Sequence, residues 1–90
     1  MLIMVLEKVS ASTRGELSRW LIEPSPGVFI GKASATVREK LWKKCTEKAV
    51  EGRVFQAWGV NNEQGFSIRT HGDTKRRVVE VEGLQLVKTL

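Results

Sequence analysis

The first apolar positions of the chain predict a buried strand followed by a short helix. Residues 1–6 form a continuous apolar run that ends at Glu7. Such a run is typical of a central strand buried on both faces, here with an acid at its carboxyl end. Residues 13–16 (Thr-Arg-Gly-Glu) match a capping box, which predicts a helix that starts at Thr13. The apolar positions of this helix are Leu17, Trp20 and Leu21.

A second, longer helix is predicted in the middle of the chain. Ser34 is a suitable N-cap residue, and the helical pattern continues to about Glu51, before Gly52. Apolar residues recur every three or four positions along this segment, as expected for a helix with one buried face. The predicted buried face consists of Val37, Leu41, Trp42, Cys45 and Ala49.

The remaining pattern predicts short strands separated by turns. Residues 23–27 (Glu-Pro-Ser-Pro-Gly) form a turn-rich breaker, and a short strand follows over residues 28–30. Residues 54–58 and 66–70 flank a loop rich in Asn and Gly, which predicts a hairpin. Further extended segments are expected at residues 78–82 and 84–87.

This order of elements predicts a single α+β domain over residues 1–90. A ferredoxin-like βαββαβ-type sandwich fits it, with one antiparallel sheet, two helices on one face and an extra C-terminal strand. The opposite face of the sheet would then be bare. A small chain usually covers such an apolar face by self-association, so we expect a homodimer through the sheet face.

Composition narrows the class of protein and its surroundings. The chain has 15 Lys and Arg against 10 Asp and Glu, and the net charge of +5 favours a polyanionic partner such as nucleic acid. No apolar run is long enough for a membrane span or a signal peptide. Cys45 is the only cysteine, which excludes an internal disulfide and suggests a reducing, cytoplasmic compartment. At its position in the helical pattern, it is expected to be a core residue.

Two groups of basic residues are candidates for binding a nucleic-acid backbone. Arg14 falls in the first turn of the predicted helix, where a cation opposes the helix dipole, and it would bind a phosphate or form a salt bridge to Glu16 or Glu23. Near His71, the residues Arg69, Lys75, Arg76 and Arg77 form the densest cationic stretch of the chain. This stretch would follow a backbone or simply be solvated. No base-reading motif accompanies either group, so shape- and charge-based binding is expected.

Several segments, taken in order, resemble the small spacer-acquisition subunit of CRISPR systems, the CRISPR-associated protein two family, with subtype I-E as the nearest match. The resemblance extends over nearly the whole chain, and its strength lies in the order and spacing of many short matches. The matching segments are residues 1–7, Arg14-Gly15, Trp20-Leu21, residues 27–31, Ser34-Ala35, Arg38-Glu39, Trp42, Ala57-Trp58, residues 62–66, Arg76-Arg77 and residues 83–87.

The resemblance implies a non-catalytic homodimer that sits between two integrase dimers in a prokaryotic cytoplasm. It would hold the middle of a double-stranded prespacer DNA and fix its length, without a cofactor. Arg14, Arg76 and Arg77 match positions that contact the phosphate backbone in this family, and the last strands, about residues 78–90, would dock the integrase or pair across the dimer. The chain departs from the family at Ser12 and Ser25, where other phosphate-contacting positions carry arginine.

Glu7 carries the alternative interpretation, a metal-dependent endonuclease that acts on RNA or DNA. Many members of the wider family have an aspartate at the end of this strand, and dimerisation pairs two of them around a divalent metal. Oxygen ligands from two such acids suit Mg²⁺. Here the acid is a glutamate. We expect instead that Glu7 is an interface carboxylate that pairs with Lys8 or a neighbouring arginine. A metal site needs defined ligand geometry, which one substituted acid does not guarantee.

Overall fold

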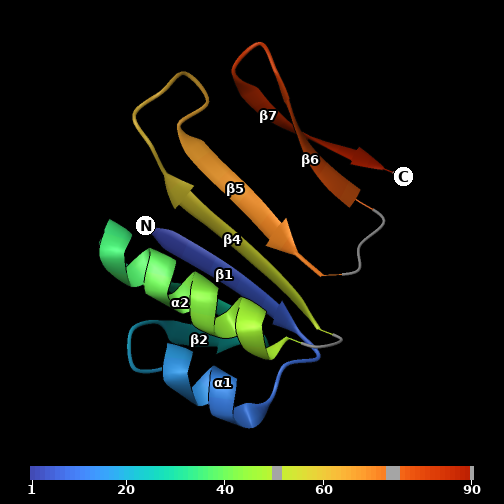
Figure 1. Cartoon of the computed structure of the whole chain (residues 1–90). Coiled ribbons are helices and arrows are strands. Elements are labelled where there is room, and N and C mark those ends of the chain that lie inside the picture. The colour runs from blue at the N-terminus through green and yellow to red at the C-terminus, as the bar shows by residue number, and fades with distance from the viewer. Residues whose placement is uncertain (50–51, 73–75, 90) are drawn as a thin grey trace.

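The computed structural model describes residues 1–49, 52–72 and 76–89 (Figure 1). The elements in chain order are β1 (Leu2–Glu7), α1 (Ala11–Leu17), β2 (Ile22–Ser25), β3 (Val28–Gly31), α2 (Ala35–Lys48), β4 (Arg53–Gly59), β5 (Phe66–His71), β6 (Arg76–Val81) and β7 (Leu84–Thr89). Strands β1 to β5 form one sheet in the order β2-β3-β1-β4-β5, and β6 and β7 form a separate two-stranded sheet. The strand pairs in both sheets are antiparallel.

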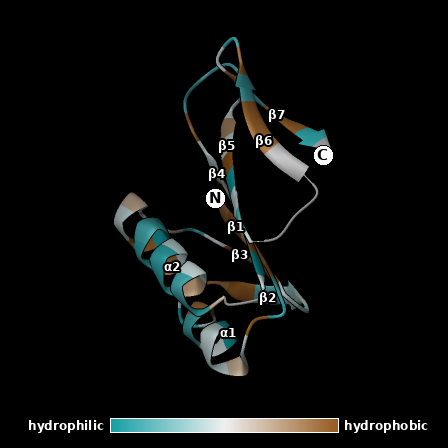
Figure 2. Ribbon diagram, turned by 45° about the vertical axis from the view of Figure 1, so that its right-hand side comes forward, coloured by the Kyte–Doolittle hydropathy of each residue, from teal (hydrophilic) through white to brown (hydrophobic). Residues whose placement is uncertain are grey.

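This architecture confirms the predicted ferredoxin-like α+β class. The elements from β1 to β4 follow the β-α-β-β-α-β order of that fold, and β5 extends the sheet beside β4. Both helices lie on one side of the sheet (Figures 1 and 2). Within the described ranges, no helix is both long and apolar enough to cross a membrane.

Strand β1 lies at the centre of the sheet and alternates between its two faces. Leu2, Met4 and Leu6 are buried beneath the helices, whereas Ile3 and Val5 on the other face are only partly buried. The prediction that this strand is buried on both faces is therefore wrong for the single chain, because the helices cover only one side of the sheet. The rest of the buried apolar core consists of Leu17, Leu21, Phe29, Leu41, Cys45, Ala49 and Val54.

The first helix begins earlier than its capping-box pattern predicts. Ser10 is the N-cap residue, and its side-chain oxygen accepts a hydrogen bond from the backbone N–H of Thr13 at 3.3 Å. Because Ser10 already caps the first turn, Thr13 lies inside the helix and is buried. The helix ends at Leu17, so Trp20 lies beyond it and is 46% exposed rather than part of a helical core face.

The segment predicted as a breaker contains an edge strand. β2 includes residues 23–25 of this segment. Gly27, with a φ of 80°, lies in the turn that leads into β3. Pro24 is tolerated in β2 because an edge strand does not need every N–H for the ladder, and the β2–β3 register is irregular between Ile22 and Ser25. Sequence reasoning missed this strand because its Pro-rich composition is typical of turns.

Helix α2 has the predicted start and the predicted buried face. The Ser34 side chain accepts a hydrogen bond from the N–H of Val37 at 3.2 Å, as an N-cap does. The helix ends at Lys48, three residues before the predicted end at Glu51, which lies outside the described residues. Burial raises the pKa of the Cys45 thiol to about 11, which fits a core residue rather than a nucleophile.

Two glutamine side chains join the described part of the β6–β7 hairpin to the main sheet. The amide of Gln85 accepts a hydrogen bond from the N–H of Ile68 at 2.6 Å and donates one to its carbonyl oxygen at 2.9 Å. The amide of Gln64 makes the same pair of contacts with the backbone of Gln85, at 2.8 and 2.7 Å. The Gln85 side chain therefore satisfies the outer edge of β5 at Ile68, and the Gln64 side chain satisfies the backbone of β7 at Gln85.

Candidate nucleic-acid interface

One end of the main sheet brings together residues that are far apart in the sequence. β1 ends at Glu7 where β4 begins at Arg53, and these two residues are direct partners in the antiparallel register. A Cβ atom on Gly52 would lie 2.5 Å from the carbonyl oxygen of Glu7, and one on Gly72 would lie 2.4 Å from the oxygen of Gly52. Because the backbones approach so closely, the ends of β1 and β5 and the start of β4 form one compact edge.

Arg14 lies close to this edge, on α1, and its guanidinium is held by one carboxylate. It donates a hydrogen bond to Oε2 of Glu23, which also accepts one from the N–H of Gly27 at 2.8 Å. The Gly27 N–H and then the Arg14 side chain lower the pKa of Glu23. Of the two salt bridges expected for Arg14, the structure has the one to Glu23, whereas Glu16 pairs with Lys44.

The position of Arg14 in its helix differs from the prediction. Because α1 begins at Ala11, Arg14 lies in the last turn, where a cation is favourable to the helix dipole. The unfavourable placement that suggested an anionic partner is therefore absent. The Arg14 side chain is 41% exposed, and one terminal nitrogen of its five-donor guanidinium is hydrogen-bonded to Glu23.

Arg14 and a second cation, Lys8, both line a hollow with a volume of about 220 Å³. The other residues that line this hollow are uncharged: Leu6, Val9, Pro26 and Gly27. Lys8 has a positive φ of 56°, which turns the chain between β1 and α1. Sequence reasoning did not assign Lys8 to the interface, because only the turn places it beside Arg14.

Strand β6 begins near the same edge. Its start at Arg76 is four positions after Gly72, so the Cα atoms of the two residues lie within roughly 14 Å of each other. Lys75 lies outside the described residues, as do the side chains of Arg76 and Arg77. We call this part of the molecule the basic end, which comprises Lys8, Arg14 and the start of β6 at Arg76.

The structure places Arg69 away from the basic end, between the sheet and α2. Its two terminal nitrogens donate to the two carboxylate oxygens of Glu39 at 3.0 and 2.7 Å, and its Nε donates to Gln56 at 2.7 Å. The guanidinium lies 4.4 Å from the centre of the Trp42 ring. The hydrogen bonds that the Glu39 carboxylate accepts from Arg69 lower the pKa of Glu39. These contacts give Arg69 a structural role in joining α2 to β4 and β5.

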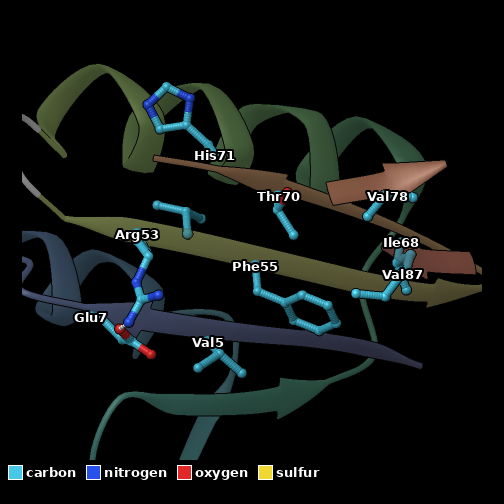
Figure 3. A pocket seen from close by; sticks show the side chains of 10 residues that line it. Val5, Glu7, Arg53, Phe55, Ile68, Thr70, His71, Val78 and Val87 are labelled. Carbon is cyan, nitrogen blue, oxygen red and sulfur yellow. Dashed lines mark hydrogen bonds and ion pairs between the residues drawn. The ribbon is translucent and has the colours of Figure 1, made fainter. Parts of the chain in front are cut away.

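Glu7 forms an ion pair with Arg53 across the β1–β4 ladder (Figure 3). Both side chains are about half exposed, at 50% and 48%. In the described part of the chain, no group of three or more His, Cys, Asp or Glu side chains is placed to hold a metal ion. Glu7 therefore offers one carboxylate to a metal, and that carboxylate already has a cationic partner.

Neither α1 nor α2 lies on the other face of the sheet (Figure 2). The antiparallel register places its side chains in rows, for example Val28, Val5, Phe55 and Thr70 across β3, β1, β4 and β5. We call this surface the open face. Its partly buried apolar residues are Ile3, Val5, Val28, Ile30, Phe55, Ala57 and Ile68. The register also places Ile22 and Phe66 on this face, and both are exposed.

A groove of about 280 Å³ lies where the open face meets the β6–β7 hairpin. Val78 and Val87 of the hairpin form one wall, and Val5 and Phe55 belong to the open face. Figure 3 shows Glu7 and Arg53 at one end of this groove and the valines of the hairpin at the other.

Comparison with known protein families gives one match that covers nearly the whole chain. A family model described as "CRISPR-associated protein (Cas_Cas2CT1978)" matches residues 1–86, from the start of β1 into β7. The match confirms the family resemblance drawn from the sequence.

Proposed function

Because the chain belongs to the CRISPR-associated family whose model matches residues 1–86, we propose that it is a non-catalytic subunit of a CRISPR spacer-acquisition complex. In this role, a homodimer bridges integrase dimers and holds double-stranded prespacer DNA by its phosphate backbone. The observation that carries the DNA-binding part is that two cations, Arg14 and Lys8, line one hollow.

The chemistry of the basic end suits phosphate groups. The Glu23 carboxylate orients the Arg14 guanidinium and leaves further N–H donors for a second acceptor, and guanidinium groups bind phosphate in a bidentate way. Contacts of this kind carry no base sequence information. The proposed binding is therefore general for duplex DNA and depends strongly on salt concentration.

The open face supports the homodimer. It exposes a row of β-branched and aromatic side chains that the helices of the same chain do not cover. Apolar surfaces of this kind are usually interaction sites, and a second copy of a small chain is the commonest partner. A two-fold dimer would present Arg14 twice and thus bind one duplex at two points.

The β6–β7 hairpin supports the integrase contact. Its register pairs Val81 with Leu84 and Val79 with Leu86, so these four side chains share one face of the hairpin. Val81, Leu84 and Leu86 are exposed. Gln85 and Val87 belong to the opposite face, where they contact or border the main sheet, so the exposed face remains for a protein partner.

Substitution of the basic residues tests the DNA-binding proposal. The triple variant Arg14→Ala, Arg76→Ala and Arg77→Ala should weaken duplex binding by about tenfold or more at moderate salt and lower the salt slope by about 0.9 for each lost phosphate contact. Fluorescence anisotropy with a labelled duplex measures both quantities, and spacer acquisition in cells should fall in parallel. Arg19→Ala, which removes an exposed cation beyond the end of α1, is the matched control. Unchanged duplex affinity and spacer acquisition in the triple variant would contradict the proposal.

The alternative function, a metal-dependent endonuclease, is tested at Glu7. A nuclease that uses this carboxylate would lose its cleavage activity in the double variant Glu7→Gln, Arg53→Gln, which removes both charges of the ion pair together. Under the proposed function, the parent protein cleaves neither RNA nor DNA with Mg²⁺ or Mn²⁺, and the double variant still supports spacer acquisition. Metal-dependent cleavage by the parent that this variant lacks would favour the nuclease instead.

A further inference from the structure

The Glu7–Arg53 ion pair lies at the edge of an apolar surface and not within a polar site. Both residues line the groove that also contains Val5, Phe55 and Val78. The two side chains point toward one another at one end of this groove (Figure 3). Any molecule that covers the open face and its groove will therefore remove water from a carboxylate and a guanidinium.

The surrounding backbone holds Arg53 in position. The register pairs it directly with Glu7, and the chain after β5 packs against its stem: a Cβ atom on Gly72 would lie 3.0 Å from the Cα atom of Arg53 and 3.1 Å from its Cγ atom. Gly72 has a φ of 110°, a conformation that other residues rarely adopt. The pairing of the two charges is thus determined by the sheet and its loops.

We propose that Arg53 is the built-in counter-cation of a homodimer interface, so that a second copy of this chain packs on the open face without a divalent cation at Glu7. This inference rests on the homodimer of the proposed function and specifies the chemistry of its interface. A lone carboxylate that loses its water in an apolar interface is strongly destabilising, whereas a hydrogen-bonded ion pair carries no net charge. Arg53 supplies to Glu7 the positive charge that a metal ion would otherwise supply.

The charge of the chain favours a second copy over nucleic acid as the partner of this face. The whole chain carries a net charge of +5, so two copies repel each other at long range. On the open face, the charges of Glu7 and Arg53 cancel, and its other side chains named above are uncharged. Among these described residues, two copies therefore meet with the charges of Glu7 and Arg53 already paired, whereas a polyanion meets a carboxylate beside that guanidinium.

Sedimentation equilibrium of the intact protein, with EDTA or with millimolar Mg²⁺ or Mn²⁺, tests this inference. The parent should have the same dimer dissociation constant in both conditions. Arg53→Gln should raise it by about tenfold in EDTA, because an uncompensated Glu7 carboxylate is then covered, and either metal should reverse much of that loss. The double variant Glu7→Gln, Arg53→Gln should return to within about threefold of the parent and show no response to metal.

Arg53→Lys keeps the positive charge and should dimerise in EDTA nearly as the parent does, which tests the inference even where Arg53→Gln does not fold. A parent dimer that EDTA dissociates would overturn the inference, and so would Arg53→Gln dimers as tight as those of the parent. In both cases the homodimer of the proposed function would stand. A parent that remains monomeric at all accessible concentrations would instead contradict the homodimer itself and this inference with it.

Discussion

At the scale of single residues, the acid beside each arginine determines what that arginine can do. Arg69 donates to both oxygens of Glu39 and to Gln56, and Trp42 covers its guanidinium, so little of it remains for a ligand. Arg14 has one carboxylate partner and is more exposed. Two arginines that look equivalent in the sequence thus differ in their capacity to bind phosphate.

Lys8 offers a prediction at this scale, because only the structure places it beside Arg14. Lys8→Asn removes its charge while asparagine tolerates the positive φ of this position. We expect duplex affinity to fall by about three- to tenfold, comparable to the loss of one phosphate contact per protomer. Fluorescence anisotropy as a function of salt concentration measures this effect.

Lys43→Gln is the control for Lys8, since Lys43 is an exposed cation on α2, outside the hollow. It should leave duplex affinity within about twofold of the parent, as expected for a surface charge away from the contact. Equal losses in the two variants would mean that overall charge, rather than the hollow at the basic end, determines binding.

At the scale of elements, the β6–β7 hairpin is attached to the main sheet differently from the strands within that sheet. Within the described residues, the amide groups of Gln85 and Gln64 connect the hairpin to β5 and to the loop before it without a continuous strand ladder. This attachment blocks the outer edge of β5 at Ile68 while it leaves the opposite face of the hairpin exposed. An element attached in this way can present an apolar surface without becoming part of the core.

Gln85→Ala should loosen the hairpin selectively. It removes both hydrogen bonds to Ile68, each worth about 1 kcal/mol, and we expect the amide of Ile68 and those of β6 and β7 to exchange with deuterium about tenfold faster. Hydrogen–deuterium exchange followed by NMR measures this change. Core amides such as that of Met4 should keep their rates.

The exposed residue Lys88 gives the control for this prediction, since Lys88→Ala alters the same strand but removes neither glutamine contact. Faster exchange in both variants alike would show that the hairpin depends on its own ladder and not on the amide of Gln85.

At the scale of the whole molecule, charged pairs connect elements around the edge of the core. Arg14–Glu23 links α1 to β2, Lys44–Glu16 links the two helices, and Arg69–Glu39 links β5 to α2. In each pair, the hydrogen-bonded cation contributes to a lowered carboxyl pKa. The fold therefore gains stability from these carboxylates only while they are ionised.

This linkage predicts that acid destabilises the protein. Because the folded-state pKa of each carboxyl lies below its ordinary value of 4.5, the contribution is complete above that value and is lost as the pH falls through the folded-state pKa. Thermal unfolding followed by circular dichroism should give a Tm that decreases below about pH 4.5. Glu39→Gln should reduce this decrease more than Glu47→Gln, an exposed change on the same helix. An identical acid dependence in the two variants would contradict the role of the Arg69–Glu39 pair.

The sequence by itself determined the elements whose signals are local. The apolar run of β1, the capped α2 and the β4–β5 hairpin follow from periodicity and turn residues within a few positions, and their order predicted the ferredoxin-like class. The family followed from many short matches in order, and the family model confirms it. The edge strand β2 and the true start of α1 were missed, because a proline-rich strand and a competing cap at Ser10 give misleading local signals.

Only the tertiary structure decided which charged residues meet. Arg53 lies opposite Glu7, 46 residues away in the sequence, through the register of β1 and β4, and Arg69 reaches Glu39 across the helix–sheet interface. Lys8 joins Arg14 through a turn with positive φ. Local propensities determine where strands and helices form, but the choice of partners depends on register and packing between distant segments, which no single segment encodes.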